Sequence, residues 1–342
     1  MRDFEEIGHT GGKIEITIHG TKAQFTIKHS NCSACRIEAV SIPLGDKSLP
    51  VYIVSDKEGF FGAECPECST YFRTSRFNKI TTCPYCGIQG PFLAFLTSNQ
   101  KKYIEAYVNK FLELFQSGKS GEIDFDSLIE KLDNKTGFIY CDERQQTVFE
   151  CAKCSNRNDI IGVYGYCSGC GYRNNLDIFN EKLAIEMNRV MNPKYDKSER
   201  QLREKEWQEV LKSSISVFEG FARDVHKELL KLPLHPNQRK AVSGISFQRI
   251  LDTREALLNI FKFDIFGEIT SDDINFINKS FNRRHLFTHN EGIVDEDYIK
   301  NTGDTSVKLG QLVKVRSNEV KRLIELLGSV GKKFVTEYDN IE

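Results

Sequence analysis

The sequence predicts a multidomain α+β protein, in which a β-rich N-terminal region with paired cysteines precedes an all-α helical bundle. Ten of the 11 cysteines stand in C-x-x-C pairs, all before residue 172. Beyond about residue 198 no cysteine occurs, and apolar residues recur at the three- and four-residue spacing of amphipathic helices. A chain of 342 residues usually forms two or three domains.

Residues 1–58 are predicted to form short β-strands. The runs "KIEITIHG", "CRIEAVSIPL" and "PVYIVSD" alternate apolar and polar residues, with Gly and Pro between them. Such alternation is typical of strands with one buried face. We therefore expect a β-rich N-terminal segment over residues 1–58.

Two groups of four cysteines predict metal-binding modules over residues 59–91 and 146–175. The pairs in "CPEC" and "CPYCG" are close enough in sequence to share one ion, and so are those in "CAKC" and "CSGCG". Four thiolates at this spacing are typical of structural zinc in ribbons or knuckles, although buried free thiols or redox pairs remain the alternative. We expect two Zn²⁺ per chain, with the ligands Cys65, Cys68, Cys83, Cys86, Cys151, Cys154, Cys167 and Cys170.

Three further cysteines have no partner group. Cys32 and Cys35 form a fifth pair, either a free thiol turn or a metal site completed by His29 and a distant ligand. Cys141 stands alone, and we expect it to be a small buried apolar residue.

The remaining segments predict helices. Residues 92–145 form an insert between the two ribbons, with a helix over 98–116 that starts at a Ser98 cap. Residues 176–198 read as a helix and a linker, stopped by Pro193. Four apolar stripes in residues 199–342 predict a bundle, and the third helix should open with Thr270 as its cap and Asp273 three residues later.

The first ribbon also contains a mixture of cations and aromatic side chains. The run "YFRTSRFNK" includes Arg73 and Arg76 beside Tyr71, Phe72 and Phe77. This mixture suits single-stranded nucleic acid, whereas in a ribbon the aromatic residues commonly pack the small core. The net charge of −1 means that a nucleic acid would have to be held by such a local patch.

The stretch "FNRRHLFTHNEG" at residues 281–292 concentrates polar chemistry at the end of the third bundle helix. On an ideal helix Arg284, His285 and Thr288 continue the buried stripe, while His289 is nearly the last helical residue and Gly292 is suited to a left-handed stop. Arg284 and His289 are separated by about 140° around the helix. They converge only if the helix ends there or a second subunit completes the site.

Three interpretations of this stretch compete. The first is polar capping of a bundle, with a histidine favoured near a helix C-terminus. The second is a metal site of His285 and His289 with Glu291 or Asp295, which two neighbouring arginines would disfavour. The third is phosphate chemistry, because arginine holds phosphate oxygens and histidine moves protons near neutral pH.

Residues 199–342 resemble the HEPN superfamily of helical-bundle proteins. The resemblance rests on an R-x(4–6)-H motif with a polar residue after the arginine, here Arg284 and His285 followed by His289, and on the run "NEGIVDEDYIKNTGD". Arg283 offers a second register. The resemblance implies a metal-independent endoribonuclease that works as a homodimer, with two motifs in one cleft, and that serves in antiphage defence or as a toxin.

Phosphate chemistry at this stretch gives each residue an expected role. His289, from one or both protomers, acts as general base or acid, and Arg284 stabilises charge on the phosphoryl oxygens. His285 orients the phosphate or its neighbour, and Asn290 fixes the His289 tautomer. Arg283, with Arg73 and Arg76, is a candidate nucleic-acid contact. The expected partners are an RNA substrate, a second copy of the chain, and an antitoxin or sensor partner.

An alternative class is a non-catalytic protein, whose zinc ribbons bind nucleic acid or protein and whose bundle dimerises or binds a nucleotide. We expect no leader peptide, because the opening run "MRDFEEIGHTGG" is acidic and lacks an apolar stretch, and no run approaches the ~20 apolar residues of a membrane span. We therefore expect a soluble cytoplasmic protein.

Overall fold

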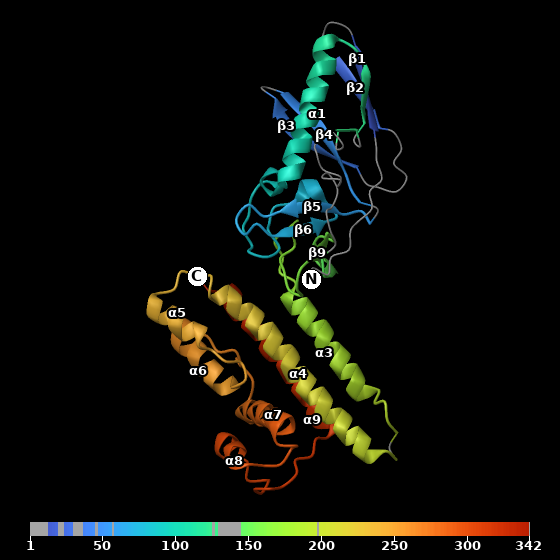
Figure 1. Ribbon diagram of the computed structural model, residues 1–342. Helices are drawn as coiled ribbons and strands as arrows, with labels where there is room; N and C mark the ends of the chain where they lie inside the picture. Colours follow the sequence, from blue (N-terminus) through green and yellow to red (C-terminus); the bar gives the residue numbers. More distant parts are fainter. Residues whose placement is uncertain are drawn as a thin grey trace. The chain divides into compact units, whose positions relative to one another are not determined.

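The computed structural model describes residues 13–19, 24–29, 37–44, 47–56, 58–124, 127–128, 145–196 and 198–341. The expectations for Cys32, Cys35 and Cys141 lie outside these residues. The chain divides into two compact units, residues 1–174 and 175–342, which are coloured along the sequence in Figure 1.

Two small antiparallel sheets confirm the predicted β-rich N-terminal region. Strand β1 (Lys13–His19) pairs with β2 (Gln24–His29) and β7 (Gly121–Asp124), and β3 (Ile37–Leu44) pairs with β4 (Lys47–Val54). The alternation buries Ile14 and Ile16 on one face of β1, as the period of a strand requires.

Helix α1 (Ser98–Ser117) covers these strands (Figure 1). It buries Tyr103 and Tyr107, whose hydroxyls donate to main-chain carbonyls of β4 at 3.0 and 3.3 Å. Its cap is Thr97 and not the predicted Ser98, because Thr97 Oγ1 accepts from the backbone N–H of Gln100 at 3.1 Å. The one-residue difference reflects a capping box, in which the Gln100 side chain also accepts from the Thr97 N–H.

The two cysteine modules form one sheet. Strands β5 (Phe61–Glu64) and β6 (Tyr71–Thr74) belong to the first ribbon, and β8 (Thr147–Glu150) and β9 (Arg157–Ile160) to the second. Their order is β5-β6-β9-β8. The modules are therefore one structural unit and not two separate domains, although residues 92–145 stand between them in the sequence.

The two ribbons are related by an approximate twofold axis. Cys151 follows Cys65 by 86 positions in the sequence. Strand β8 follows β5, and β9 follows β6, by the same number of positions. The pair Arg73 and Asp159, which face each other where β6 meets β9, has this same offset. A residue and its own equivalent can face each other only at the axis, so this pair marks its position.

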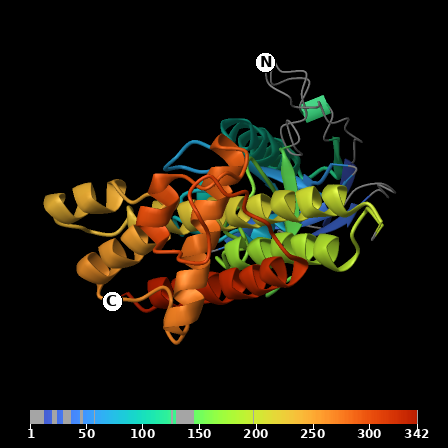
Figure 2. The same cartoon turned by 90° about the horizontal axis from the view of Figure 1, so that it is seen from below.

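The C-terminal unit is built on three long helices that lie side by side (Figure 2). They are α3 (Asn175–Met191), α4 (Arg200–Leu229) and α9 (Ser317–Asp339). The predicted boundary at residue 199 is wrong, because α3 packs inside the bundle. Its Phe179 stacks on Phe221 at 4.3 Å between ring centroids, and a methyl group at Gly331 of α9 would collide with the same ring.

Shorter helices complete this unit. Helices α5 (Pro236–Ser243) and α6 (Ile250–Phe261) pack together, and α7 (Ser271–His289) contacts α4, α9 and α8 (Glu296–Thr302). The predicted cap of α7 is confirmed, since Thr270 Oγ1 accepts from the Asp273 N–H at 3.2 Å. Among the described helices, none has both the length and the apolar character needed to cross a membrane.

Candidate functional site

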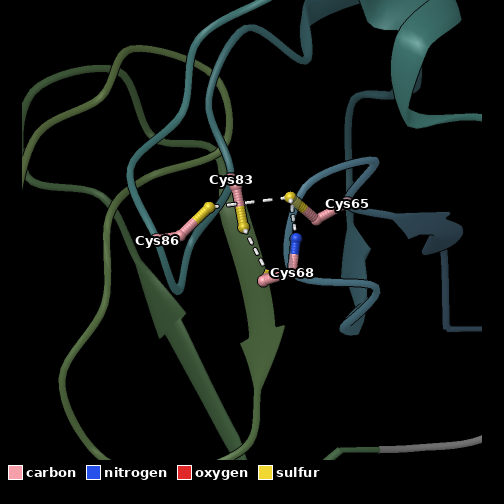
Figure 3. Close-up of side chains that lie close together, drawn as sticks. All are labelled: Cys65, Cys68, Cys83 and Cys86. Atoms are coloured by element: carbon pink, nitrogen blue, oxygen red, sulfur yellow. Dashed lines mark hydrogen bonds between the residues drawn. The ribbon is translucent and has the colours of Figure 1, made fainter.

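The first cysteine group has the geometry of a tetrahedral metal site. Cys65 Sγ lies 3.6 Å from Cys86 Sγ, and Cys68 Sγ lies 3.8 Å from Cys83 Sγ. Figure 3 shows the four side chains converging from two loops. Four sulfurs held at about 2.3 Å from one ion in tetrahedral geometry stand about 3.8 Å apart. The group could therefore hold a metal ion.

The second group repeats this geometry. Cys151 Sγ lies 3.6 Å from Cys170 Sγ, and Cys154 Sγ lies 3.5 Å from Cys167 Sγ. Burial raises the pKa of the Cys154 and Cys170 thiols. Four thiolates at such spacing need a cation to balance their charge, so this group too could hold a metal ion.

The turns at these sites explain why the pairs take their shape. The residue after each C-x-x-C pair has a left-handed backbone, with φ of 53° at Ser69, 78° at Gly87, 54° at Ser155 and 73° at Gly171. This conformation lets the N–H of that residue donate to the carbonyl of the first cysteine, at 2.8 to 3.1 Å. Each loop thereby closes around its two sulfurs.

The second ribbon adds polar groups around one ligand. Asn158 Nδ2 lies 3.7 Å from Cys167 Sγ and Asn156 Nδ2 lies 3.9 Å from it. Both amides are buried, and Ser168 Oγ donates to Asn158 Oδ1 at 2.6 Å. N–H groups aimed at a sulfur stabilise its thiolate form and orient it toward a metal.

Each ribbon also supports the second cysteine loop of the other. The Thr82 N–H donates to the Ser168 carbonyl at 3.1 Å, and the Tyr166 N–H donates to the Pro84 carbonyl at 2.9 Å. These two bonds are equivalent under the approximate twofold axis. Ser168 and Pro84 lie between the cysteines of the two groups, so these bonds join the two candidate metal-binding loops directly.

The expectation that Arg73 contacts nucleic acid is wrong. Its side chain is 1% exposed, with Nη2 at 3.1 Å from Asp56 and 2.7 Å from Glu58, and Nη1 at 3.1 Å from Asp159. Burial raises the pKa of Asp159 even though Arg73 acts to lower it. Arg73 also lies over the ring of Phe60 at 4.5 Å. It is a structural cation at the axis of the ribbon pair.

The other members of that segment divide between core and surface. Phe72 and Phe77 are fully buried, which confirms the alternative that ribbon aromatics pack the core. Arg76 is exposed, and its Nη1 donates to the Cys154 carbonyl at 3.3 Å. Of the two arginines in the segment, Arg76 alone could reach an external ligand.

The end of α7 carries the motif residues of the C-terminal unit. Arg284 points toward α4, where its Nη2 lies 2.9 Å from Glu219 Oε1. The exposed fractions of these side chains are 19% and 5%. Burial raises the pKa of Glu219, while Arg284 and Arg223 act to lower it. The carboxylate therefore fixes the direction of Arg284.

Arg283 has a different environment, and the expectation that it contacts nucleic acid is wrong. Its Nη1 lies 2.8 Å from Glu319 of α9, and its Nε donates to the Tyr298 hydroxyl at 3.4 Å. Tyr298 in turn donates to Asp304 at 2.9 Å. Arg283 thus ties α7 to α8 and α9.

The two histidines meet on the exposed side of the helix. Their ring centroids are 4.6 Å apart, with 47° between the ring planes. His285 and Thr288 are exposed, so the expectation that they continue the buried stripe is wrong. In this last turn Leu286 is the buried residue and packs with Val294 and Tyr298, so the buried face continues through Leu286 while His285 and Thr288 face outward.

Asn290 caps the helix. Its backbone N–H donates to the Leu286 carbonyl at 2.8 Å, and its side-chain amide donates to the Ile293 carbonyl at 2.7 Å. Gly292 has φ of 82°, as predicted, and a side chain there would also press on the Phe287 ring.

A cleft of about 610 Å³ opens beside α7, between α6 and α8. Arg284 and His285 line it, whereas His289 and Asn290 are not among its lining residues. The walls are polar and of mixed charge. They include the amides Gln248, Asn278, Asn282 and Asn301, the cations Arg249 and Lys300, and the carboxylates Asp252, Asp295 and Asp297.

The metal interpretation of this stretch is not supported by its geometry. Neither Glu291 nor Asp295 joins the two histidines in a group with ligand spacing, and across the described residues the two cysteine quartets are the only such groups.

Glu219 is the site residue that sequence reasoning missed. Its signal was a carboxylate between Phe218 and Phe221 on a stripe predicted to be buried.

Comparison with known proteins adds no further assignment. No protein-family model, curated protein or solved structure matches the chain. The likeness of residues 199–342 to the HEPN superfamily therefore rests on the arginine–histidine motif and on its place at the end of a bundle helix.

Proposed function

We propose that this protein is a metal-independent endoribonuclease whose reaction site is the cleft at the end of α7, and that two structural zinc ions hold its ribbons. One grouping carries the proposal: an arginine oriented by a buried carboxylate stands beside two exposed imidazoles. Arg284 and His285 share the cleft, and His289 contacts His285. A guanidinium can hold phosphoryl oxygens while imidazoles transfer protons.

In the proposed reaction the ribose 2′-oxygen attacks the adjacent phosphorus. His289, from this copy or a second one, takes the proton of the 2′-hydroxyl, the O2′–P bond forms, and the P–O5′ bond breaks. A second imidazole, from His285 or from His289 of another copy, donates a proton to the leaving O5′. Arg284 stabilises the negative charge that grows on the phosphoryl oxygens. The products are a 2′,3′-cyclic phosphate and a 5′-hydroxyl.

The substrate follows from this chemistry. The nucleophile is part of the RNA, so positioning can replace activation of an external water, and DNA lacks the required hydroxyl. A second cavity of about 890 Å³ between α5 and α6 shares Gln248, Arg249 and Asp252 with the reaction cleft. A single strand could continue from one cavity into the other along these shared residues.

The active unit in this proposal is a homodimer. Helix α7 includes both Arg284 and His289 without interruption, so the turn of the helix still separates them. A second copy whose His289 faces the first Arg284 would complete the site. By its resemblance, such a nuclease would act in antiphage defence or as a toxin, with the zinc ribbons sensing a substrate or a partner.

The test is cleavage of end-labelled transfer RNA and total RNA by the full-length protein, with and without EDTA. The Arg284→Ala variant should lose at least about 100-fold in rate, because a preorganised cation at the phosphoryl group is absent. His289→Ala should lose activity as well. The matched control is Arg322→Ala, which removes another arginine–carboxylate pair of α7, that with Asp273.

Two outcomes would contradict the proposal. One is cleavage by Arg284→Ala at the wild-type rate, and the other is cleavage that depends on added divalent metal. Arg283→Ala provides a further comparison. It should lower the melting temperature through the lost Glu319 pair, while the folded fraction keeps its activity.

A second candidate is a non-catalytic binding protein, favoured by the three carboxylates in the cleft, which would repel a polyanion. The ribbons would then bind a nucleic acid or a protein, and the bundle would dimerise or bind a nucleotide. Expression in cells separates the two candidates. A nuclease should be toxic and Arg284→Ala should relieve the toxicity, whereas cells should tolerate both forms of a binding protein.

A further inference from the structure

A third cavity lies away from the motif, where the beginning of α4 meets the segment that leads into α9. Its volume is about 340 Å³, within the range of small-molecule sites. The first two turns of α4 contribute Arg200, Arg203 and Trp207, and the segment before α9 contributes Lys314 and Arg316. Neither the motif nor the ribbons account for this grouping.

The cavity is strongly cationic. Arg200, Arg203, Lys314 and Arg316 line it, and Glu204 is the one acidic residue among its lining residues. Glu204 is already paired with Arg200 at 3.0 Å. In the described part of the chain no carboxylate lies within ion-pair distance of Lys314 or Arg316. Like charges collected in this way repel one another, and a bound anion would relieve the repulsion.

The aromatic wall is the second observation. Trp207 is partly buried, and the Arg203 guanidinium lies 5.3 Å from its ring centroid. Trp207 Nε1 and Arg203 Nε are buried atoms with no hydrogen-bond partner. Both residues line the cavity, so its wall joins an aromatic ring to a cation, a surface suited to a planar anionic ligand.

We propose that this cavity binds a nucleotide, with its phosphate held by Lys314 and Arg316 and its base placed against Trp207. Cations supply charge-assisted bonds to phosphate oxygens, and an indole ring offers a stacking surface to any base. Ser317, which also lines the cavity, begins α9, and the start of a long helix adds further positive potential. This site is independent of the nuclease proposed above.

The chain offers a local probe of this site, because Trp207 is its only tryptophan. Fluorescence of full-length protein excited selectively at tryptophan would be titrated with adenosine monophosphate, guanosine monophosphate and a short single-stranded RNA. We expect a saturable change in the signal. Calorimetry on the same samples measures binding directly, so a ligand that binds without changing the fluorescence is still detected.

Paired variants connect the signal to the cavity. Lys314→Gln combined with Arg316→Gln should weaken binding by at least about tenfold, because two charged donors are lost. Lys332→Gln, an exposed lysine of α9 outside the cavity, should bind like the wild type. Melting temperatures establish that both variants are folded.

The outcomes are decisive in both directions. Saturation by mononucleotides at lower concentration than by RNA identifies a free nucleotide as the ligand, and the reverse order identifies a nucleotide within an RNA strand; either result supports the site. The proposal is overturned if neither fluorescence nor calorimetry shows saturable binding, or if the double variant binds as tightly as the wild type. Because binding is measured without turnover, the result does not depend on whether the protein cleaves RNA.

Discussion

Two neighbouring arginines on α7 have opposite roles. Arg283 is paired with Glu319, and its place between α8 and α9 makes it part of the packing. Arg284 faces Glu219 and the cleft. Successive helical positions differ by 100° in direction, so one arginine reaches α9 and the other reaches α4. The proposed reaction site therefore uses Arg284 and not Arg283.

Glu219 should give the protein a distinct dependence of stability on pH. Burial raises its pKa above the ordinary value of 4.5, against the opposing charges of Arg284 and Arg223. Because the pKa of Glu219 is higher in the folded protein than in the unfolded chain, the folded protein binds this proton more tightly. The stabilisation from this proton is complete at low pH and is lost as the pH rises through the folded pKa.

The measurement compares wild type with Glu219→Gln, which cannot titrate. Urea unfolding at a series of pH values from about 4 to neutral gives the free energy of unfolding of each. The wild-type value minus the Glu219→Gln value should decrease as the pH rises above 4.5. A difference that is constant or increases over this range would show that Glu219 is not a desolvated carboxylate.

At the scale of elements, the ribbon pair should bind metal as one unit. Hydrogen bonds connect the second loop of each ribbon to the other ribbon, and β6 pairs with β9. Metal ligation supplies much of the folding free energy of such small modules. Loss of one site should therefore weaken the other.

Damage to one metal site should remove more than one zinc ion from the chain, because the other site is weakened as well. Cys65→Ser combined with Cys68→Ser should lower the zinc content from about two per chain to clearly below one, as measured by native mass spectrometry. Cys32→Ser combined with Cys35→Ser is the matched control and should retain about two. If the first variant keeps a full equivalent of zinc in a folded second ribbon, the sites are independent.

At the scale of the whole molecule, the proposed nuclease requires two copies. Exposed apolar side chains lie in the segment that follows α7, with exposed fractions of 39% at Ile293, 58% at Leu309 and 54% at Leu312. Ile293 and Leu312 are bridged to each other. A second copy that meets α7 near His289 would cover part of this surface.

Sedimentation of the full-length protein should therefore show a dimer. Leu309→Lys combined with Leu312→Lys should raise the dissociation constant and lower RNA cleavage in parallel, because charge replaces apolar area at the interface. Ile185→Lys changes an equally exposed residue of α3 and should alter neither property. A monomer that cleaves RNA at full rate would exclude the composite site.

The features predicted from the sequence are those set by local chemistry. The spacing of Cys65, Cys68, Cys83 and Cys86 determines a loop geometry, and Thr270 and Gly292 determine where α7 begins and ends. In each case the residues that interact are close to one another in the sequence. The alternation that places Ile14 and Ile16 on one face is likewise local.

The tertiary structure decided the features that join distant segments. Arg73 reaches Asp159 across the ribbon pair, and Arg283 reaches Glu319, so neither is available to a nucleic acid. Glu219 faces Arg284 from another helix, and α3 belongs to the bundle through Phe179 and Phe221. The sequence by itself determined which residues could bind metal and which carry charge. Only the packing determined which of them have partners already, because a side chain's neighbours come mostly from elsewhere in the chain.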